Sequence, residues 1–213
     1  MQTVNDLRNV FLRKPNDADL LRLLKSQHKL PYSYVGVGAT ADESAIPSGY
    51  VVDRMQMALG RGESIFAATK QGLAAWAQFD LGWCEAWPRN TPIRSGEVVA
   101  VVARSMGLWW ANATRIAYVV DESAGKAGDE IVKFGFAYGT LPGHVEMGEE
   151  LFLVEWDRAT DAVTYSILAF SRPRHPLAKI GRPLVRRLQR RFREDSAAAM
   201  LQWVRKVVPD AAN

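Results

Sequence analysis

Residues 131–144 read IVKFGFAYGTLPGH, and this stretch decides the fold class. Three aromatic side chains alternate with three small ones, which is the two-residue period of a β-strand. The aromatic positions are Phe134, Phe136 and Tyr138, and the small positions are Gly135, Ala137 and Gly139. One face of the predicted strand is therefore aromatic and the other is nearly bare. A bare strip permits the close approach of a helix, another backbone or a flat ligand.

Further β-rich runs lie on both sides of this stretch, separated by segments with turn character. With the stretch itself they are residues 97–104, 109–120, 131–138, 150–157 and 162–170. The links at residues 123–125 and 157–161 are typical of hairpin connections. Because parallel strands need crossovers of about a dozen residues or more, these runs predict an antiparallel meander.

The residues before these runs predict one more strand and several helices. A strand is expected over residues 50–58, and a helix follows over residues 63–78 after a Gly-Arg-Gly turn. Residues 32–49 are rich in Gly, Ser, Ala and Pro and predict an extended loop. Within residues 1–30, apolar spacing predicts two helices, the first including Val10 and Phe11 and the second capped near Asn16.

The chain ends in a long predicted helix that begins at Pro183 and spans about 24 residues, or about 36 Å. Its apolar stripe is interrupted by one polar residue, Ser196. The stripe consists of Val185, Leu188, Phe192, Ala199, Trp203 and Val207. A helix of this length is buried in a domain of this size only by lying along a sheet.

These elements predict an α+β fold in which a curved antiparallel sheet grips the long C-terminal helix. This order of elements resembles the helix-grip architecture of the birch-pollen-allergen and START-related proteins, which implies a cavity between sheet and helix. An antiparallel barrel with a packed helix is the alternative. Residues 1–30 are interpreted as a helical extension and residues 31–213 as a single domain.

Four segments together resemble a bacterial and plant family of domains of unknown function, DUF1990. They are FGFAYGTLPGHVEMGEE (134–150), YVGVGAT (34–40), LGRG (59–62) and FSRP (170–173). The resemblance covers about residues 32–206. Val145 departs from the pattern, because relatives are expected to carry proline there. The resemblance implies kinship and no particular activity.

The composition excludes several classes of protein. The chain has 213 residues, is 48% hydrophobic and 23% charged, and so can bury a sizeable core. Its longest stretches without a charged residue are 12 residues long and contain proline or several glycines, which predicts no transmembrane helix. The first thirty residues lack the apolar core of a signal peptide. The single cysteine, Cys84, excludes an internal disulfide, and a cytoplasmic location is expected.

Positive charge is concentrated near the C-terminus. Residues 171–213 contain eleven Lys and Arg against three acids, and the segment from Arg172 to Arg193 has nine basic residues and no acid. Such a segment is typical of a solvated helix face that pairs with acids elsewhere in the domain. The alternative is a surface that docks on nucleic acid or anionic lipid.

A candidate ligand site is built from the 131–150 stretch and two arginines. Arg115 alternates with apolar residues, so it needs either a partner such as Glu155 or a ligand anion. The candidate ligand-binding residues are Tyr138, Thr140, His144, Glu146, Glu149, Arg172 and Arg115 for the polar part and Trp109, Trp110, Phe134 and Phe136 for the wall.

The preferred hypothesis is that this site binds a small apolar or amphipathic molecule. An enzyme that uses the same cavity, with His144 as general acid or base, is a second hypothesis. An interaction module that docks through the basic final helix is a third. One imidazole among scattered carboxylates is a weak metal signal, so no metal and no cofactor are expected. The oligomeric state is left open.

Overall fold

The computed structural model describes residues 9–122, 130–174 and 182–209, so the predicted link at 123–125 lies outside the described residues. The elements are, in chain order, β1 (Val10–Phe11), α1 (Asp17–Gln27), the 3-10 helices η1 (Ala39–Ala41) and η2 (Glu43–Ala45), β2 (Val51–Arg61), α2 (Glu63–Ala74), the 3-10 helix η3 (Ala77–Phe79), β3 (Cys84–Trp87), β4 (Val98–Ser105), β5 (Leu108–Asp121), β6 (Ile131–Thr140), β7 (Glu146–Asp157), β8 (Ala162–Pro173) and α3 (Arg182–Val207).

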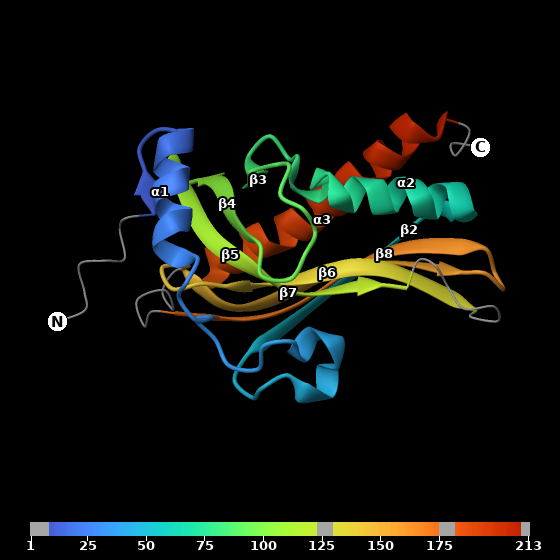
Figure 1. The fold of residues 1–213 in the computed structure, drawn as a ribbon, viewed down its shortest axis with the longest axis horizontal. Coiled ribbons are helices and arrows are strands. Elements are labelled where there is room, and N and C mark those ends of the chain that lie inside the picture. The colour runs from blue at the N-terminus through green and yellow to red at the C-terminus, as the bar shows by residue number, and fades with distance from the viewer. Residues whose placement is uncertain (1–8, 123–129, 175–181, 210–213) are drawn as a thin grey trace.

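The strands form one antiparallel sheet in the order β2-β8-β7-β6-β5-β4-β3, with β1 paired to β5. Strands β3 to β8 are neighbours in chain order, which confirms the predicted meander. The sheet curls, and α2 and α3 lie together against its concave face (Figure 1). This face is called the inner face below, and the opposite one the outer face. The predicted α+β fold with a gripped C-terminal helix is confirmed.

One local prediction was wrong, and one strand was missed. Val10 and Phe11 form a strand instead of a helix, because they pair with Trp110 and Trp109 along the part of the β5 edge that β6 does not reach. Strand β3 was not predicted, because four residues are too few to display a period.

The helix predicted over residues 63–78 is shorter than expected. It ends at Ala74, and Trp76 takes a left-handed conformation with φ of 57°. The Trp76 indole N–H donates to the carbonyl of Thr91 at 2.8 Å. The Trp76 ring packs on that of Phe136, with 4.9 Å between the ring centroids. These tertiary contacts outweigh the helical periodicity of the sequence.

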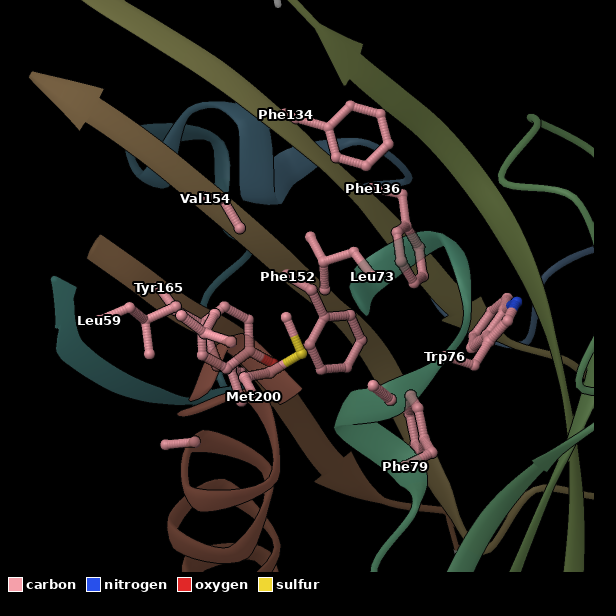
Figure 2. Packing of buried hydrophobic residues seen from close by; sticks show 14 of the residues in the cluster. Leu59, Leu73, Trp76, Phe79, Phe134, Phe136, Phe152, Val154, Tyr165 and Met200 are labelled. Carbon is pink, nitrogen blue, oxygen red and sulfur yellow. The ribbon is translucent and has the colours of Figure 1, made fainter. Parts of the chain in front are cut away.

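The aromatic face of β6 lies in the main core between the sheet and α2, η3 and α3 (Figure 2). Phe152 of β7 is fully buried at its centre and contacts four other rings. They are Phe79, Phe136, Tyr138 and Phe192. Rings therefore fill much of the space in which the sequence predicted a cavity.

Helix α3 packs along the sheet through Ser196, Ala197, Met200 and Val204, which are buried. Of the predicted stripe, Phe192 and Trp203 are partly buried against the core, whereas Val207 is 42% exposed. The polar interruption of the stripe, Ser196, is fully buried, and its hydroxyl lies 2.9 Å from that of Tyr165 on β8. The two hydroxyls satisfy each other inside the core. Like the other described helices, α3 lacks the length of apolar sequence needed to cross a bilayer.

Polar contacts attach α3 to both edges of the sheet. Arg186 makes two hydrogen bonds to the carboxylate of Asp53 on β2, at 2.5 and 2.7 Å, and Arg193 reaches the same carboxylate at 3.1 Å. Near the opposite edge, the Trp83 indole donates to Asp195 at 2.7 Å. Part of the basic segment is thus turned inward onto an acid of the sheet.

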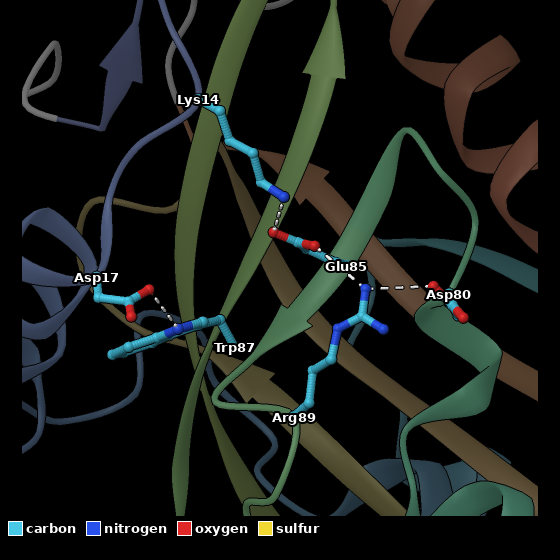
Figure 3. Close-up of polar contacts among 6 residues, drawn as sticks. All are labelled: Lys14, Asp17, Asp80, Glu85, Trp87 and Arg89. Atoms are coloured by element: carbon cyan, nitrogen blue, oxygen red, sulfur yellow. Dashed lines mark hydrogen bonds and ion pairs between the residues drawn. The ribbon is translucent and has the colours of Figure 1, made fainter.

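The N-terminal segment packs against the sheet near β3, β4 and β5. Helix α1 begins with a capping box, in which the Asn16 side chain accepts from the backbone N–H of Asp19 at 3.0 Å, close to the predicted cap. Lys14 pairs with Glu85 of β3 at 2.7 Å, and the Trp87 indole donates to Asp17 at 3.1 Å (Figure 3). The division into residues 1–30 and 31–213 stays a prediction.

Candidate functional site

The predicted site residues divide between the two faces of the sheet. Residues directly opposite each other on neighbouring strands point to the same face. One such row contains Ile116, Tyr138, Glu150, Ala169 and Asp53, and lies on the inner face. The adjacent row contains Arg115, Gly139, Glu149, Phe170 and Val52, and lies on the outer face. By the same alternation, Phe134 and Phe136 face inward, whereas Trp109 and Arg172 face outward. The structure therefore does not bring the predicted residues into one site.

On the inner face, Tyr138 meets a carboxylate that the sequence did not single out. The Tyr138 hydroxyl donates to Glu150 at 2.7 Å, and Glu150 is only partly exposed. Burial raises the pKa of the Glu150 carboxyl to about 7, against the lowering effects of the Tyr138 hydrogen bond and of Arg193. Glu150 therefore titrates near neutral pH beneath α3.

The substitution Glu150→Gln is expected to make stability less dependent on pH. A carboxyl whose pKa rises from 4.5 to about 7 on folding favours the native state fully below pH 4.5, and this contribution is lost as the pH rises to about 7. Glutamine should therefore stabilise by about 2 kcal/mol at about pH 8 and by nothing near pH 4.5. Urea unfolding across this range measures the difference. Glu155→Gln, whose parent carboxylate pairs with Lys133 at 3.1 Å on the outer face, is the control and should not follow this curve.

Three of the predicted residues lie in or next to the loop between β6 and β7: Thr140 ends β6, His144 lies in the loop and Glu146 begins β7. His144 accepts a hydrogen bond from the backbone N–H of Glu146 at its Nδ1, at 3.0 Å. Burial, assisted by Arg174, lowers the pKa of His144 to about 4, so the ring is neutral at neutral pH. Thr140 accepts the backbone N–H of Gly148 at 3.0 Å and lies 2.7 Å from the Ser33 hydroxyl. No cluster of three metal-ligating side chains occurs within residues 9–122, 130–174 and 182–209.

Glu149 is buried on the outer face, where it organises the loop of residues 32–42. Its carboxylate accepts four hydrogen bonds within 2.9 Å. The donors are the Tyr34 hydroxyl, the Gly38 backbone N–H, and both the backbone N–H and the hydroxyl of Thr40. Gly38 has φ of 88°, a conformation that other residues rarely adopt. The carboxylate is therefore an anchor for the chain that crosses the outer face.

The bare strip of β6 receives one member of this loop. A Cβ atom at Gly139 would lie 2.1 Å from the Tyr34 hydroxyl oxygen. The sequence predicted close approach to this strip, and at Gly139 the approaching group is a tyrosine of the same chain.

Both predicted anion-binding arginines have partners within the chain. Arg115 donates to the carbonyls of His28 at 2.6 Å and Leu30 at 2.9 Å, just beyond the end of α1. The predicted pair with Glu155 was wrong, because Glu155 lies two strands away opposite Lys133. Arg172 lies over the ring of Tyr50, 4.5 Å from its centroid.

A groove of about 590 Å³ lies on the outer face, between the η1–η2 segment and the sheet. Residues of two cross-strand rows, apart from their β6 members, form its floor. The first is Arg54, Leu168, Leu151, Ala137 and Tyr118, and the second is Gln56, Ser166, Leu153, Gly135 and Val120. From β6, Ala137 and Gly135 are buried below the surface, and Lys133 lines the groove.

The groove is apolar in the middle and polar at its rim. Leu153, Leu168 and Val120 are partly exposed on the floor. One wall carries Thr40, whose hydroxyl lies 2.8 Å from that of Tyr118. The rim holds the ion pairs Arg54–Glu43 and Lys133–Glu155. These features suit a molecule with an apolar body and polar ends.

The groove residues were missed because they come from strands far apart in the sequence. The signal that could have found them is the alternation in β7 and β8. Leu151, Leu153 and Leu168 occupy positions that face away from the aromatic core, and apolar residues there indicate a second surface to cover.

Comparison with known proteins shows which family the chain is similar to. A family model described as "Domain of unknown function (DUF1990)" matches residues 33–199. The chain is 35% identical over 206 residues to a UPF0548 protein of Dictyostelium discoideum, covering 90% of this chain and 94% of that protein. It is 31% identical over 191 residues to a UPF0548 protein of Deinococcus radiodurans, covering 85% and 91%.

Among solved structures, the hypothetical protein jhp0584 from Helicobacter pylori is similar with a TM-score of 0.47 and 12% identity, over 75% of this chain and 92% of that one. Human STARD10 is similar with a TM-score of 0.45 and 12% identity, over 93% and 86%.

Proposed function

Because the chain belongs to the DUF1990 family, and its sheet carries an open groove of ligand size, we propose that the protein binds a small apolar or amphipathic molecule on the outer face. The single observation that carries this proposal is the groove of about 590 Å³ with an apolar floor. Ligand pockets in proteins commonly measure about 300–1,000 Å³. The proposed ligand site lies on the face opposite to the cavity that the sequence predicted.

The polar rim supports an amphipathic ligand over a purely apolar one. The cations Arg54 and Lys133 stand at opposite sides of the floor, and each is paired with a carboxylate. Exposed ion pairs of this kind exchange partners at little cost, so a polar group of the ligand can join either one. We further propose a cytoplasmic setting, where the buried thiol of Cys84 stays reduced.

The substitution Leu153→Asn is expected to weaken binding about tenfold, because it removes apolar contact from the floor. Leu153 faces outward, so the core on the inner face stays intact. Titration with the fluorescent probe 1-anilinonaphthalene-8-sulfonate measures the affinity. Ile131→Asn is the matched control, because Ile131 is also apolar and 47% exposed but lies outside the groove.

Native mass spectrometry of freshly purified protein identifies the natural ligand directly. A retained compound that Leu153→Asn loses and Ile131→Asn keeps would support the groove as its site. Equal probe affinity in the wild type and both variants, with no retained compound, would reject the proposal.

A further inference from the structure

The hairpin between β4 and β5 extends past the end of β6. The first β5 residue that pairs with β6 is Thr114, opposite Thr140, whereas β5 begins six residues earlier at Leu108. At about 3.3 Å per residue, the paired ends of β4 and β5 extend about 20 Å past the end of β6. Within the described residues, β1 pairs with this part of β5 on the same edge as β6, and β3 pairs with β4 as far as Ala103.

The turn of this hairpin carries an exposed apolar residue in a strained conformation. Met106 has φ of 53° and Gly107 has φ of 77°, between the paired residues Ser105 and Leu108. Two positive φ angles define a turn that favours Asn, Asp or Gly at both positions. Met106 is nevertheless 66% exposed, so it has little packing to compensate for the strain. Folding alone gives no reason for a methionine here.

A second exposed apolar side chain follows β1. Phe11, the last residue of β1, pairs with Trp109, and Leu12 comes directly after it. Leu12 is 87% exposed, the largest value among the exposed apolar residues. Two partly exposed tryptophans lie directly behind. We call the group of Leu12, Met106, Leu108, Trp109 and Trp110 the hairpin tip, in which the two tryptophans are consecutive in β5 and point to opposite faces of the sheet.

Positive charge surrounds the hairpin tip. Arg104, opposite Trp109 on β4, is exposed, and so is Arg13, which follows Leu12. In the described part of the chain, no ion pair involves either arginine. Lys14 lies over the Trp109 ring, 5.6 Å from its centroid, while it pairs with Glu85.

The basic side of α3 adjoins the same end of the sheet. The Arg104 backbone N–H donates to the carbonyl of Trp83 at 2.7 Å, and Arg191 of α3 lies over the Trp83 ring at 4.6 Å. Arg186 and Arg193 of the basic segment turn inward to Asp53, so they leave less charge for a docking face on α3 itself. Arg191 therefore brings one cation of the basic segment to this end of the sheet, where it pairs with Asp195 at 3.2 Å.

We propose that the hairpin tip docks the protein on the surface of an anionic lipid membrane. Leu12 and Met106 would enter the boundary between headgroups and acyl chains, where tryptophan rings with their polar N–H are favoured. Arg13 and Arg104 would face the anionic headgroups, which attract cations near the surface. This role is separate from the proposed ligand groove, which lies farther along the outer face.

Vesicle sedimentation tests the proposal with the whole chain. Wild-type protein is expected to bind vesicles containing about 30% phosphatidylserine in phosphatidylcholine at least about tenfold more strongly than pure phosphatidylcholine, and raised salt should weaken this binding. The double variant L12S/M106N should lose about tenfold or more of the affinity for the anionic vesicles. Asn suits the left-handed turn position, so the variant keeps the hairpin. V35S/V37S, which alters residues 59% and 49% exposed in the loop before η1, is the matched control and should bind like the wild type.

Two results would overturn the proposal. The first is that the wild type does not bind vesicles, or binds anionic and neutral vesicles with equal affinity. This result would overturn the proposal even if the hairpin tip were found to bind a protein. The second is unchanged binding of L12S/M106N, provided that its thermal unfolding matches that of the wild type. Tryptophan fluorescence gives an independent readout, because insertion of Trp109 and Trp110 shifts the emission to shorter wavelength.

Discussion

Glu149→Ala is expected to lower the free energy of unfolding by about 4 kcal/mol, because four donors in a buried region lose their shared acceptor. Each unsatisfied donor costs about 1–3 kcal/mol, and water entering the space offsets part of the total. Urea unfolding at neutral pH measures the loss. Glu149→Gln should recover only part of the lost stability. The glutamine amide nitrogen is itself a donor and cannot accept the hydrogen bonds that the second carboxylate oxygen of Glu149 accepts.

The matched control is Glu155→Ala, which removes a partly exposed carboxylate from the same strand. Its pair with Lys133 is expected to contribute less than about 1 kcal/mol. The two glutamates also differ in their effect on the groove. Loss of Glu149 releases the wall that includes Thr40 and Glu43, so probe binding should fall together with stability. Equal losses of stability in both variants would contradict the anchoring role.

Gly139→Ala is expected to cost about 3 kcal/mol, because the added methyl group overlaps the Tyr34 hydroxyl, 2.1 Å from the Cβ position. The backbone at Gly139 lies outside the left-handed region, so alanine brings no conformational strain there. The cost is steric: Tyr34 must move, and its hydrogen bond to Glu149 is lost.

A double-mutant cycle with Tyr34→Ala tests this explanation. Tyr34 is 7% exposed, so its truncation is itself destabilising. In that background the methyl group at residue 139 meets open space, and Gly139→Ala should cost less than about 1 kcal/mol. If the glycine substitution costs the same in both backgrounds, the clash with Tyr34 is not its cause.

The sequence was sufficient for the long strands of the sheet, because local alternation carries most of the information about a strand. Phe134, Phe136 and Tyr138 read as one face and occupy one face of β6. The long helix was predicted for a similar reason, since its apolar residues follow a helical period. It starts at Arg182, one residue before the predicted start at Pro183. The sequence did not predict the short strand β3. It also did not predict the end of α2, where tertiary contacts outweigh the helical periodicity.

The candidate site was much less predictable, because face assignment in a strand depends on its register. The expected strand over residues 150–157 begins at Glu146 in the structure, and Glu149 and Glu150 then point to opposite faces. One glutamate anchors an outer loop and the other titrates beneath α3. Their partners, Thr40 and Tyr138, lie 109 and 12 residues away in the chain, and no local pattern indicates which glutamate takes which partner.

The pairing of β2 with β8 has a consequence for the chain during its synthesis on the ribosome. Val51 pairs with Ser171, so β2 leaves the ribosome long before its partner exists. At about 5–20 residues per second, the delay lasts roughly 6–24 seconds. Through that interval β2 offers unpaired backbone N–H and C=O groups to any neighbouring nascent chain. Arg54 lies at an outward position of β2 and places a charge on this unpaired strand. Strand edges that carry charges resist aggregation.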